Sequence, residues 1–510
     1  MVNHSSDTKR IAKNTLLLYV RMLFLMLVGL YTSRVVLGAL GEDDFGIYNV
    51  VGGVVAMFSV ISGSLSSAIS RFITFELGKG NQQRLRLTFS TAVTVQICMS
   101  LIVVLLAEPL GIWFLNNKMT IPLERMTAAN WVLQFSILTF VINLLSVPYN
   151  ASIVAHERMS AFAYIGMFEG LGKLAVAFMI LKSPTDKLVY YASLMCLLSL
   201  VVRLVYTIYC RRNLQECRFS ICLDKGLLKE MSGFAGWNFI GAASGILRDQ
   251  GGNILINLFS GPVANAARGI SVQLGGAVQS FVTNFMTAVN PQITKSYANG
   301  DRDYMMTLIF KGARFSFYLL LILSLPVLFN TEYILELWLK DVPARTMNFV
   351  CLALVLTMSE SISNPLVTAM LATGRIRNYQ IVVGGLQLMN LPLAYLVLAA
   401  GYPPESVLVV AIIVSQCCLA ARLVMMKGMI GLPVWRFLKE VYLNVLVVAA
   451  FAGVVMLPVQ RMLPDGLGGF LLSCCFCVMV AAFSVCFLGL AKQERGALWS
   501  KVSEMMCKLR

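Results

Sequence analysis

Residues 14–70 read NTLLLYVRMLFLMLVGLYTSRVVLGALGEDDFGIYNVVGGVVAMFSVISGSLSSAIS. An apolar run at 15–38 is long enough to cross a bilayer, which takes about 20 residues in a helix. A short acidic turn at 41–44 follows, and then a second apolar run at 49–70. We expect two membrane helices joined by this turn, with a basic loop over 71–87 after them.

The composition of the whole chain agrees with this start. Apolar residues make up 58% of the 510 residues and charged residues 13%, whereas soluble domains average about 45–50% apolar and about 25% charged. Repeated apolar runs separated by short polar loops indicate a polytopic helical membrane protein. The first run is too long for a signal-peptide core and no small-residue cleavage site follows it, so we expect it to be retained.

Fourteen such runs are recognised. They lie near 15–38, 49–70, 88–111, 129–150, 161–181, 188–210, 232–258, 264–290, 308–330, 346–370, 380–400, 405–426, 440–458 and 468–490. If both termini are cytoplasmic, most of the 41 Lys and Arg fall on cytoplasmic segments, as the positive-inside rule requires. The net charge of +16 is therefore a topology signal whose partners are anionic lipid headgroups, not nucleic acid.

The second half of the chain repeats features of the first. Gly46-Ile47 recurs as Gly269-Ile270, and Pro148 recurs as Pro365 at a similar offset. Six helices in each half predict two parallel, pseudo-symmetric six-helix bundles with a cleft between them, followed by two further helices. The expected parts are a first bundle at 1–210, a basic cytoplasmic linker at 211–231, a second bundle at 232–426, and a terminal helix pair with a cytoplasmic tail at 427–510. Helical spacing of apolar residues in 491–510 predicts an interfacial helix.

Three stretches resemble a known family. They are SRVVLGALGEDDFGIYNVV at 33–51, SRFITFELGKGN at 70–81 and VPYNASIVAHERMSAFAYI at 147–165. Together with the helix arrangement they are similar to bacterial polysaccharide (O-antigen-type) flippases of the multidrug/oligosaccharidyl-lipid/polysaccharide exporter superfamily. These motifs are recurring turns of the family and carry no catalytic signature.

The resemblance implies a function for the chain. A flippase of this kind moves an undecaprenyl-pyrophosphate-linked oligosaccharide, as a unit of O-antigen, capsule or exopolysaccharide, from the cytoplasmic to the periplasmic leaflet of the bacterial inner membrane by alternating access. Lipid-linked oligosaccharide and membrane lipids are the implied partners, and glycan-assembly membrane proteins are a further candidate class. A multidrug cation antiporter of the same superfamily and a membrane glycan polymerase or ligase are the alternatives.

Basic residues inside the predicted spans cost roughly 2.5–3.5 kcal/mol each. Six of them are Arg21, Arg34, Lys173, Arg203, Arg248 and Arg268. Such residues should face water, a partner or a ligand, and the planar guanidinium suits a pyrophosphate because it binds phosphate oxygens in pairs.

Their positions suggest different roles. Under the repeat, Arg248 corresponds to a residue one helical turn from Arg21, so the two are expected to line the cleft and bind substrate, with structural pairing as the alternative. Arg34 and Arg268 lie toward the outer ends of their helices, where they either receive the headgroup or reach the interface. Arg203, near a cytoplasmic end, is expected to reach the surface.

The remaining basic residue and the acids are assigned in the same way. Lys173 follows Glu169 by four positions, which fits either an intrahelical ion pair or a substrate site. Asp249 and Glu360, with Glu169, are candidates for a proton or Na⁺ coupling site. Asp249 follows Arg248 directly, but neighbours on a helix point about 100° apart and need not pair.

Three prolines are candidate hinges for alternating access: Pro148, Pro365 and Pro291. Simple helix termination is the alternative, and Pro291 is expected to close the helix at 264–290.

Other chemistry finds no support in the sequence. No G-x-x-x-x-G-K-[ST] motif is present, so no ATP drive is expected. Cys217 and Cys222 share a cytoplasmic loop, but with two His in the chain we expect no metal site and no other cofactor. Every outer loop is short, so we expect a transporter and not an enzyme.

Overall fold

The computed structural model describes residues 4–56, 58–117, 121–183, 186–217, 224–339, 342–464, 466–491 and 494–496. Every regular element in these ranges is a helix. The chain divides into two compact units: unit 1 comprises Met1–Ala242 with Asn290–Gly300, and unit 2 comprises Ala243–Val289 with Asp301–Arg510. The expected linker at 211–231 lies within unit 1, and its residues 218–223 are outside the described ranges, as is most of the expected interfacial helix at 491–510.

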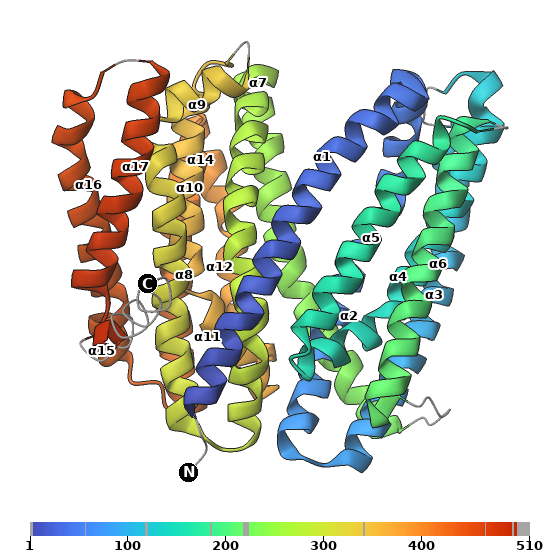
Figure 1. Cartoon of the computed structure of the whole chain (residues 1–510), viewed down its shortest axis with the longest axis horizontal. Helices are drawn as coiled ribbons and strands as arrows, with labels where there is room; N and C mark the ends of the chain where they lie inside the picture. Colours follow the sequence, from blue (N-terminus) through green and yellow to red (C-terminus); the bar gives the residue numbers. More distant parts are fainter. Residues whose placement is uncertain are drawn as a thin grey trace, which may run out of the picture. The chain divides into compact units, whose positions relative to one another are not determined.

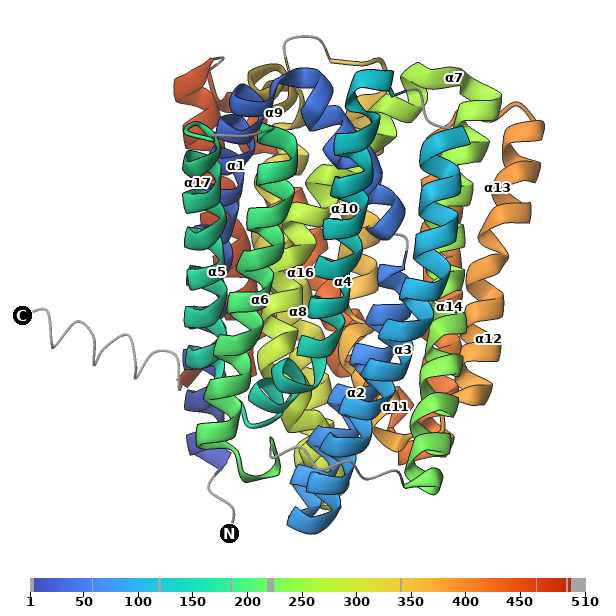
Figure 2. The same cartoon turned by 90° about the vertical axis from the view of Figure 1, so that its right-hand side faces the viewer.

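Unit 1 is a bundle of long helices. Its elements are α1 (His4–Ala56), α2 (Ser59–Lys79), α3 (Gln82–Asn117), α4 (Met126–Ala155), α5 (Met159–Ile180), α6 (Lys187–Asn213), the short turns η1 (Leu123–Arg125) and η2 (Gln215–Cys217), and both ends of α7 (Lys225–Ala298). Helix α4 packs against α3 and α6, and α1 packs along α5 (Figures 1 and 2). Val132, Leu133 and Leu188 are central in its apolar core.

Unit 2 contains the middle of α7 and the helices after it. These are α8 (Arg302–Phe329), α9 (Thr331–Trp338), α10 (Thr346–Ser361), α11 (Asn364–Thr373), α12 (Arg377–Leu388), α13 (Asn390–Ala399), α14 (Ser406–Ile430), α15 (Val434–Phe437), α16 (Asn444–Met462) and α17 (Leu467–Ser484). Helix α14 packs against α10, α12 and α13, while α8 packs against α17, which lies beside α16 (Figure 1).

Two glycines break the long helices at matching places in the two halves. Gly41 in α1 has φ 81° and ψ 172°, and Gly261 in α7 has φ 77° and ψ −175°. Only glycine adopts this conformation without steric cost. The helix resumes directly after each glycine, so the acidic turn predicted at 41–44 is a break at a single residue.

Two other boundary predictions are wrong. Helix α2 continues to Lys79 and α3 begins at Gln82, so the basic loop predicted over 71–87 shrinks to Gly80 and Asn81. Arg71 is instead a helical residue whose guanidinium carbon lies 4.6 Å from the ring centre of Phe75. Helix α7 passes through Pro291 to Ala298, so this proline does not close the helix.

The surface and length of the helices identify a multi-pass membrane protein. Within the described ranges, eleven helices are long and apolar enough to span a bilayer. Large apolar side chains face outward on them, for example Leu105 at 72% exposure and Leu27 at 65%, which a protein surrounded by water would bury. The predicted ranges at 232–258 and 264–290 are helical and 49–70 is divided between α1 and α2, but all three fall outside these eleven. The all-α membrane fold class is thus confirmed.

Candidate functional site

In unit 1, the side chain of Arg21 extends from α1 toward α5. Among the described residues, no carboxylate forms an ion pair with its guanidinium. The guanidinium carbon lies 4.3 Å from the ring centre of Phe162, a cation–π contact. Its Nε is buried and has no hydrogen-bond partner in the described part of the chain. Gly166 makes room for the side chain, since a Cβ there would collide with Arg21 Nε. Unit 1 therefore holds a half-buried cation with unused hydrogen-bonding capacity.

The ion pair predicted further along α5 is present. Lys173 Nζ lies 2.7 Å from Glu169 Oε1, and both side chains are partly exposed. The intrahelical ion pair is confirmed, whereas a role of either residue in binding substrate or an ion stays a prediction. Arg34 is exposed on α1. Arg203 was expected to reach the surface. It is half-buried instead and donates to the Ile142 carbonyl of α4 at 3.5 Å.

In unit 2, Arg248 is held by two acids. Its Nε donates to Asp249 Oδ1 at 3.0 Å and its Nη1 donates to Glu360 Oε1 at 2.5 Å. The Arg248 side chain is 17% exposed, against 56% for Asp249 and 39% for Glu360. Asp249 therefore pairs with the residue directly before it, although neighbours on a helix need not pair. Arg248, predicted to bind substrate, and Asp249 and Glu360, predicted to bind the coupling ion, thus form one cluster.

Arg268 lies deep in unit 2, on the segment of α7 after the Gly261 break. It is 6% exposed, so it does not reach the interface from this position. Its Nε donates to Asn253 Oδ1 at 2.6 Å, on the segment before the break, and its Nη1 has no partner among the described residues. The break thus folds α7 so that a guanidinium from one segment meets an amide from the other.

A cavity of about 160 Å³ opens beside Arg248 in unit 2. Its polar lining includes Arg248, Glu360, Ser363, Gln387, Asn390 and Arg422. Arg422 donates to Tyr379 Oη at 2.7 Å and to Ser363 Oγ at 3.1 Å, so its hydrogen bonds go to neutral oxygens. The sequence prediction missed Arg422 because it lies near the end of a predicted span. The internal repeat carried the signal, since Arg203 maps to within one helical turn of it.

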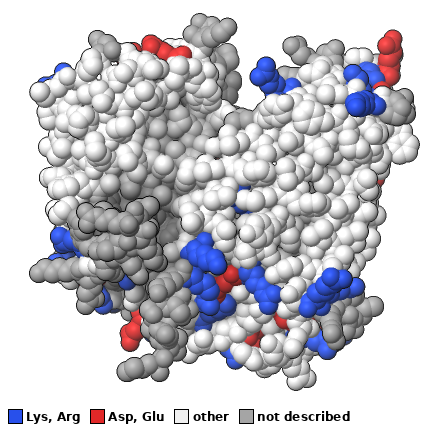
Figure 3. Space-filling model, viewed as in Figure 1, with Lys and Arg blue, Asp and Glu red and all other residues white. Residues whose placement is uncertain are grey.

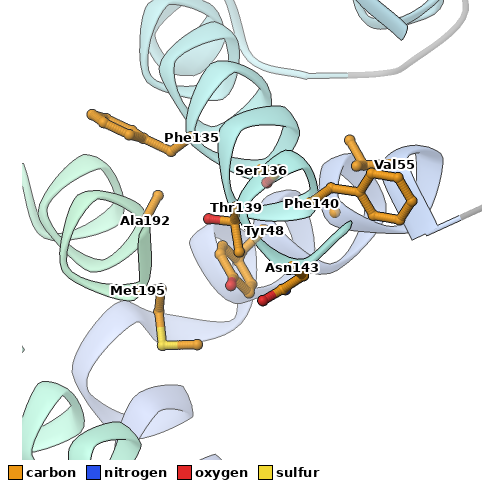
Figure 4. Close-up of a pocket in the computed structure, with 10 residues that line it drawn as sticks. Tyr48, Val55, Phe135, Ser136, Thr139, Phe140, Asn143, Ala192 and Met195 are labelled. Atoms are coloured by element: carbon orange, nitrogen blue, oxygen red, sulfur yellow. The ribbon is translucent and has the colours of Figure 1, made fainter. Parts of the chain in front are cut away.

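Unit 1 has a pocket of similar size and different chemistry. Its volume is about 200 Å³, and α1 after the Gly41 break, α4 and α6 form its walls. Figure 4 shows the side chains of Tyr48, Thr139 and Asn143 close together at this pocket, with Phe135 and Met195 on its edge. The described residues that line it include none with a charged side chain.

Charged networks hold the ends of the unit 1 helices. Figure 3 shows charged side chains near the ends of these helices and a mostly uncharged band between them. At one end the carboxylate of Glu157, which is 2% exposed, accepts from Lys295 at 2.5 Å, Gln292 at 2.6 Å and Arg10 at 2.8 Å. This network attaches the end of α7 to unit 1. The sequence analysis did not predict this network, although Glu157 lies in one of the three family-like stretches.

Arg125 forms the corresponding network at the other end. It pairs with Asp44 and, at 2.5 Å, with Asp186. Partial burial alone would raise the pKa of Asp186, but the hydrogen bond from Arg125 and those from the first backbone amides of α6 lower it. Partial burial likewise opposes the charge on Arg125, and the two carboxylates outweigh it and raise the pKa of Arg125.

Comparisons with known proteins agree with this structure. Residues 11–297 match the family model of the polysaccharide biosynthesis protein family. The chain is 20% identical over 298 residues to the uncharacterized membrane protein EpsK of Bacillus subtilis (strain 168); the match covers 58% of this chain and 58% of that relative. The chain therefore spans less than two thirds of the curated relative that it matches.

Solved structures share the fold. One is an outward-facing multidrug resistance MATE family transporter of the MOP superfamily, with a TM-score of 0.71 and 11% identity. Another is a MOP superfamily transporter from Pyrococcus furiosus whose binding pocket is described as having reverse polarity, with a TM-score of 0.71 and 12% identity. Each match covers 83% of this chain and 96% of the solved chain. At these identities the likeness shows the fold alone.

Proposed function

Because the chain belongs to the polysaccharide biosynthesis protein family, we propose that it moves an undecaprenyl-pyrophosphate-linked oligosaccharide from the cytoplasmic to the periplasmic leaflet of the bacterial inner membrane. Both termini lie in the cytoplasm in this proposal. The family and the fold are those of a membrane exporter, and the specific cargo is what we add.

The observation that carries the proposal is the state of Arg21. A guanidinium within a membrane helix is costly, so it needs compensation. Phe162 supplies part of this, about 1–2 kcal/mol for a half-buried cation–π contact, but the buried Nε still has no acceptor among the described residues. A phosphate oxygen of the lipid headgroup is the acceptor that fits, because charge-assisted N–H···O bonds to phosphate are among the strongest in proteins.

Arg248 would also bind the headgroup, but its ion pairs with Asp249 and Glu360 control when it can do so. A carboxylate and a phosphate compete for the same guanidinium N–H groups, so Arg248 binds substrate only when Glu360 or Asp249 releases it. A proton or Na⁺ taken up by Glu360 would weaken that ion pair and free Arg248. The coupling ion and the substrate therefore act on one arginine, which links uptake of the ion to capture of the headgroup. Arg268, whose Nη1 has no partner in the described part of the chain, is the further guanidinium available to the headgroup in unit 2.

The experiment that tests the cargo is depletion of the protein in its host. We expect an intact lipid-linked oligosaccharide to accumulate on the cytoplasmic leaflet, where externally added glycan-modifying reagents do not reach it. Accumulation on the outer leaflet instead would assign the block to polymerisation or ligation and would contradict the proposal.

A second candidate is favoured by one finding, the shared fold with a multidrug resistance transporter. A cation exporter would use the partly exposed carboxylates of Asp249 and Glu360 as its binding groups. Expression in a drug-sensitive strain distinguishes the two, since resistance to cationic drugs that depends on Glu360 and not on Arg21 would favour drug export.

A further inference from the structure

We propose that the cavity of unit 2 binds one sugar ring of the cargo through Asn390 and Arg422. This inference rests on the proposed function and adds a carbohydrate site to the phosphate sites. The cavity volume of about 160 Å³ is below the roughly 300–1,000 Å³ of pockets that enclose a drug-sized ligand. It therefore accommodates a single ring and not a whole oligosaccharide.

Asn390 supplies the first reason. It is 5% exposed and lines the cavity. Its Nδ2 donates to the Gln387 carbonyl at 2.9 Å, and this bond identifies which end of the amide is the nitrogen. The other end, Oδ1, can only accept a hydrogen bond. Oδ1 is buried and has no hydrogen-bond donor among the described residues. A buried acceptor without a partner costs about 1–3 kcal/mol, so the site needs a ligand that donates a hydrogen bond.

Arg422 supplies the second reason. Its guanidinium has neutral partners, Tyr379 Oη and Ser363 Oγ, and no ion pair with a carboxylate is found for it among the described residues. It lines the same cavity as Arg248. The described lining thus has two guanidiniums and one carboxylate, Glu360, and this excess of positive charge disfavours a metal cation and favours a ligand that accepts hydrogen bonds.

The ligand must therefore donate to Asn390 Oδ1 and accept from Arg422. A simple anion accepts but does not donate, and an ammonium ion donates but does not accept. A hydroxyl group does both, and a sugar ring presents several of them at once. A water molecule also donates and accepts but presents a single oxygen, whereas the cavity of about 160 Å³ has room for a hydroxylated ring, neutral or carrying a carboxylate that Arg422 would hold.

The test uses the full-length protein purified in nanodiscs, with methyl glucoside, N-acetylglucosamine and glucuronate as separate probes. The melting temperature is measured as each probe is titrated, for wild type and for Asn390→Leu. Sugars stabilise most proteins by exclusion from the surface, so the quantity of interest is the shift in wild type beyond the shift in the variant. Asn284→Leu, which replaces a half-buried asparagine of α7 outside the cavity, is the matched control.

We expect at least one probe to give a saturable shift in wild type and in Asn284→Leu that Asn390→Leu lacks. Without sugar, Asn390→Leu should melt at or above the wild-type temperature, because it removes an unpaired buried acceptor. Arg422→Lys keeps the charge and should weaken the shift. Equal shifts in all variants, or a saturable shift with NaCl in place of sugar, would overturn the inference. The depletion experiment is independent of this result, so the cargo assignment and the sugar site fail separately.

Discussion

Arg21 of unit 1 and Arg248 of unit 2 lie on the first membrane helix of their respective halves, yet their surroundings differ in kind. Arg21 lies over an aromatic ring and keeps a buried N–H without a partner among the described residues. Arg248 donates to two carboxylates. The contrast teaches that a repeated fold can place the same type of side chain once against an aromatic ring and once between two carboxylates.

The cavities of the two units repeat the contrast. The pocket of unit 1 is lined by aromatic, hydroxyl and amide groups, and that of unit 2 by two arginines and a glutamate. Unit 1 also contains an arginine between two acids, but Arg125 with Asp44 and Asp186 lies outside the membrane spans. The Arg248 cluster differs in that one of its acids, Glu360, lies within a candidate membrane span.

The largest expected effect comes from Arg21→Ala. A hydrogen bond to a charged group is worth about 1.5–3 kcal/mol, so losing it should reduce glycan export roughly tenfold to a hundredfold. Export is measured as surface glycan at equal protein level. Arg436→Ala removes an arginine whose side chain is 65% exposed and should leave export unchanged. If Arg21→Ala exported glycan at the wild-type level, Arg21 would not bind the substrate, and its proposed difference from Arg248 would be wrong.

Gly166→Ala tests the space around Arg21 and should have the next largest effect. The added methyl group collides with Arg21 Nε and must displace the guanidinium from Phe162. We expect export to fall severalfold while the protein still folds. Gly63→Ala, in a helix of the same unit and with nothing near its Cβ, should retain export and gain slight stability. Equal export by both variants would show that the position of Arg21 is unimportant.

Glu360→Gln tests whether the Glu360 carboxylate controls the availability of Arg248 for the headgroup. The neutral amide still accepts a hydrogen bond but no longer holds Arg248 as an ion pair, so Arg248 becomes available for the headgroup at every pH. We expect export by vesicles to lose its dependence on the pH gradient, with a smaller change in maximal rate. An unchanged response to the gradient would exclude Glu360 as the coupling acid.

The smallest effect is expected at Asp186, in the network outside the spans. Arg125 lowers the pKa of Asp186, so the pair stabilises the fold above the unfolded pKa, about 3.9, and this contribution is lost as pH falls through the folded pKa. Because the Asp186 side chain is 35% exposed, screening should limit it to less than about 1 kcal/mol. Asp186→Asn should therefore melt slightly lower than wild type at pH 7 and at the same temperature in strong acid.

Several residues of the candidate site follow from the amino-acid sequence. The repeat pointed to Arg21 and Arg248, and the intramembrane position of Arg268 marked it as a residue in need of a partner. Arg422 and Asn390 were missed because neither breaks a local pattern: Arg422 lies near a predicted helix end, and Asn390 is one of three amides in an otherwise apolar run. The interruptions near Gly41 and Gly261 were predicted as turns between separate helices, but their form, a single glycine with a positive φ angle inside a helix, was not, since a glycine reveals its φ angle only when the flanking helices are in place.

The sequence by itself determined that the chain crosses a membrane and that its helices carry buried cations, because bilayer thickness and the cost of burying charge act on short, local stretches. Only the tertiary structure decided which cation is neutralised. Arg248 and Glu360 are separated by 112 positions, and no local pattern records that α7 and α10 bring them within hydrogen-bonding distance. Partner choice in a low-dielectric interior depends on packing, and packing is a property of the folded unit.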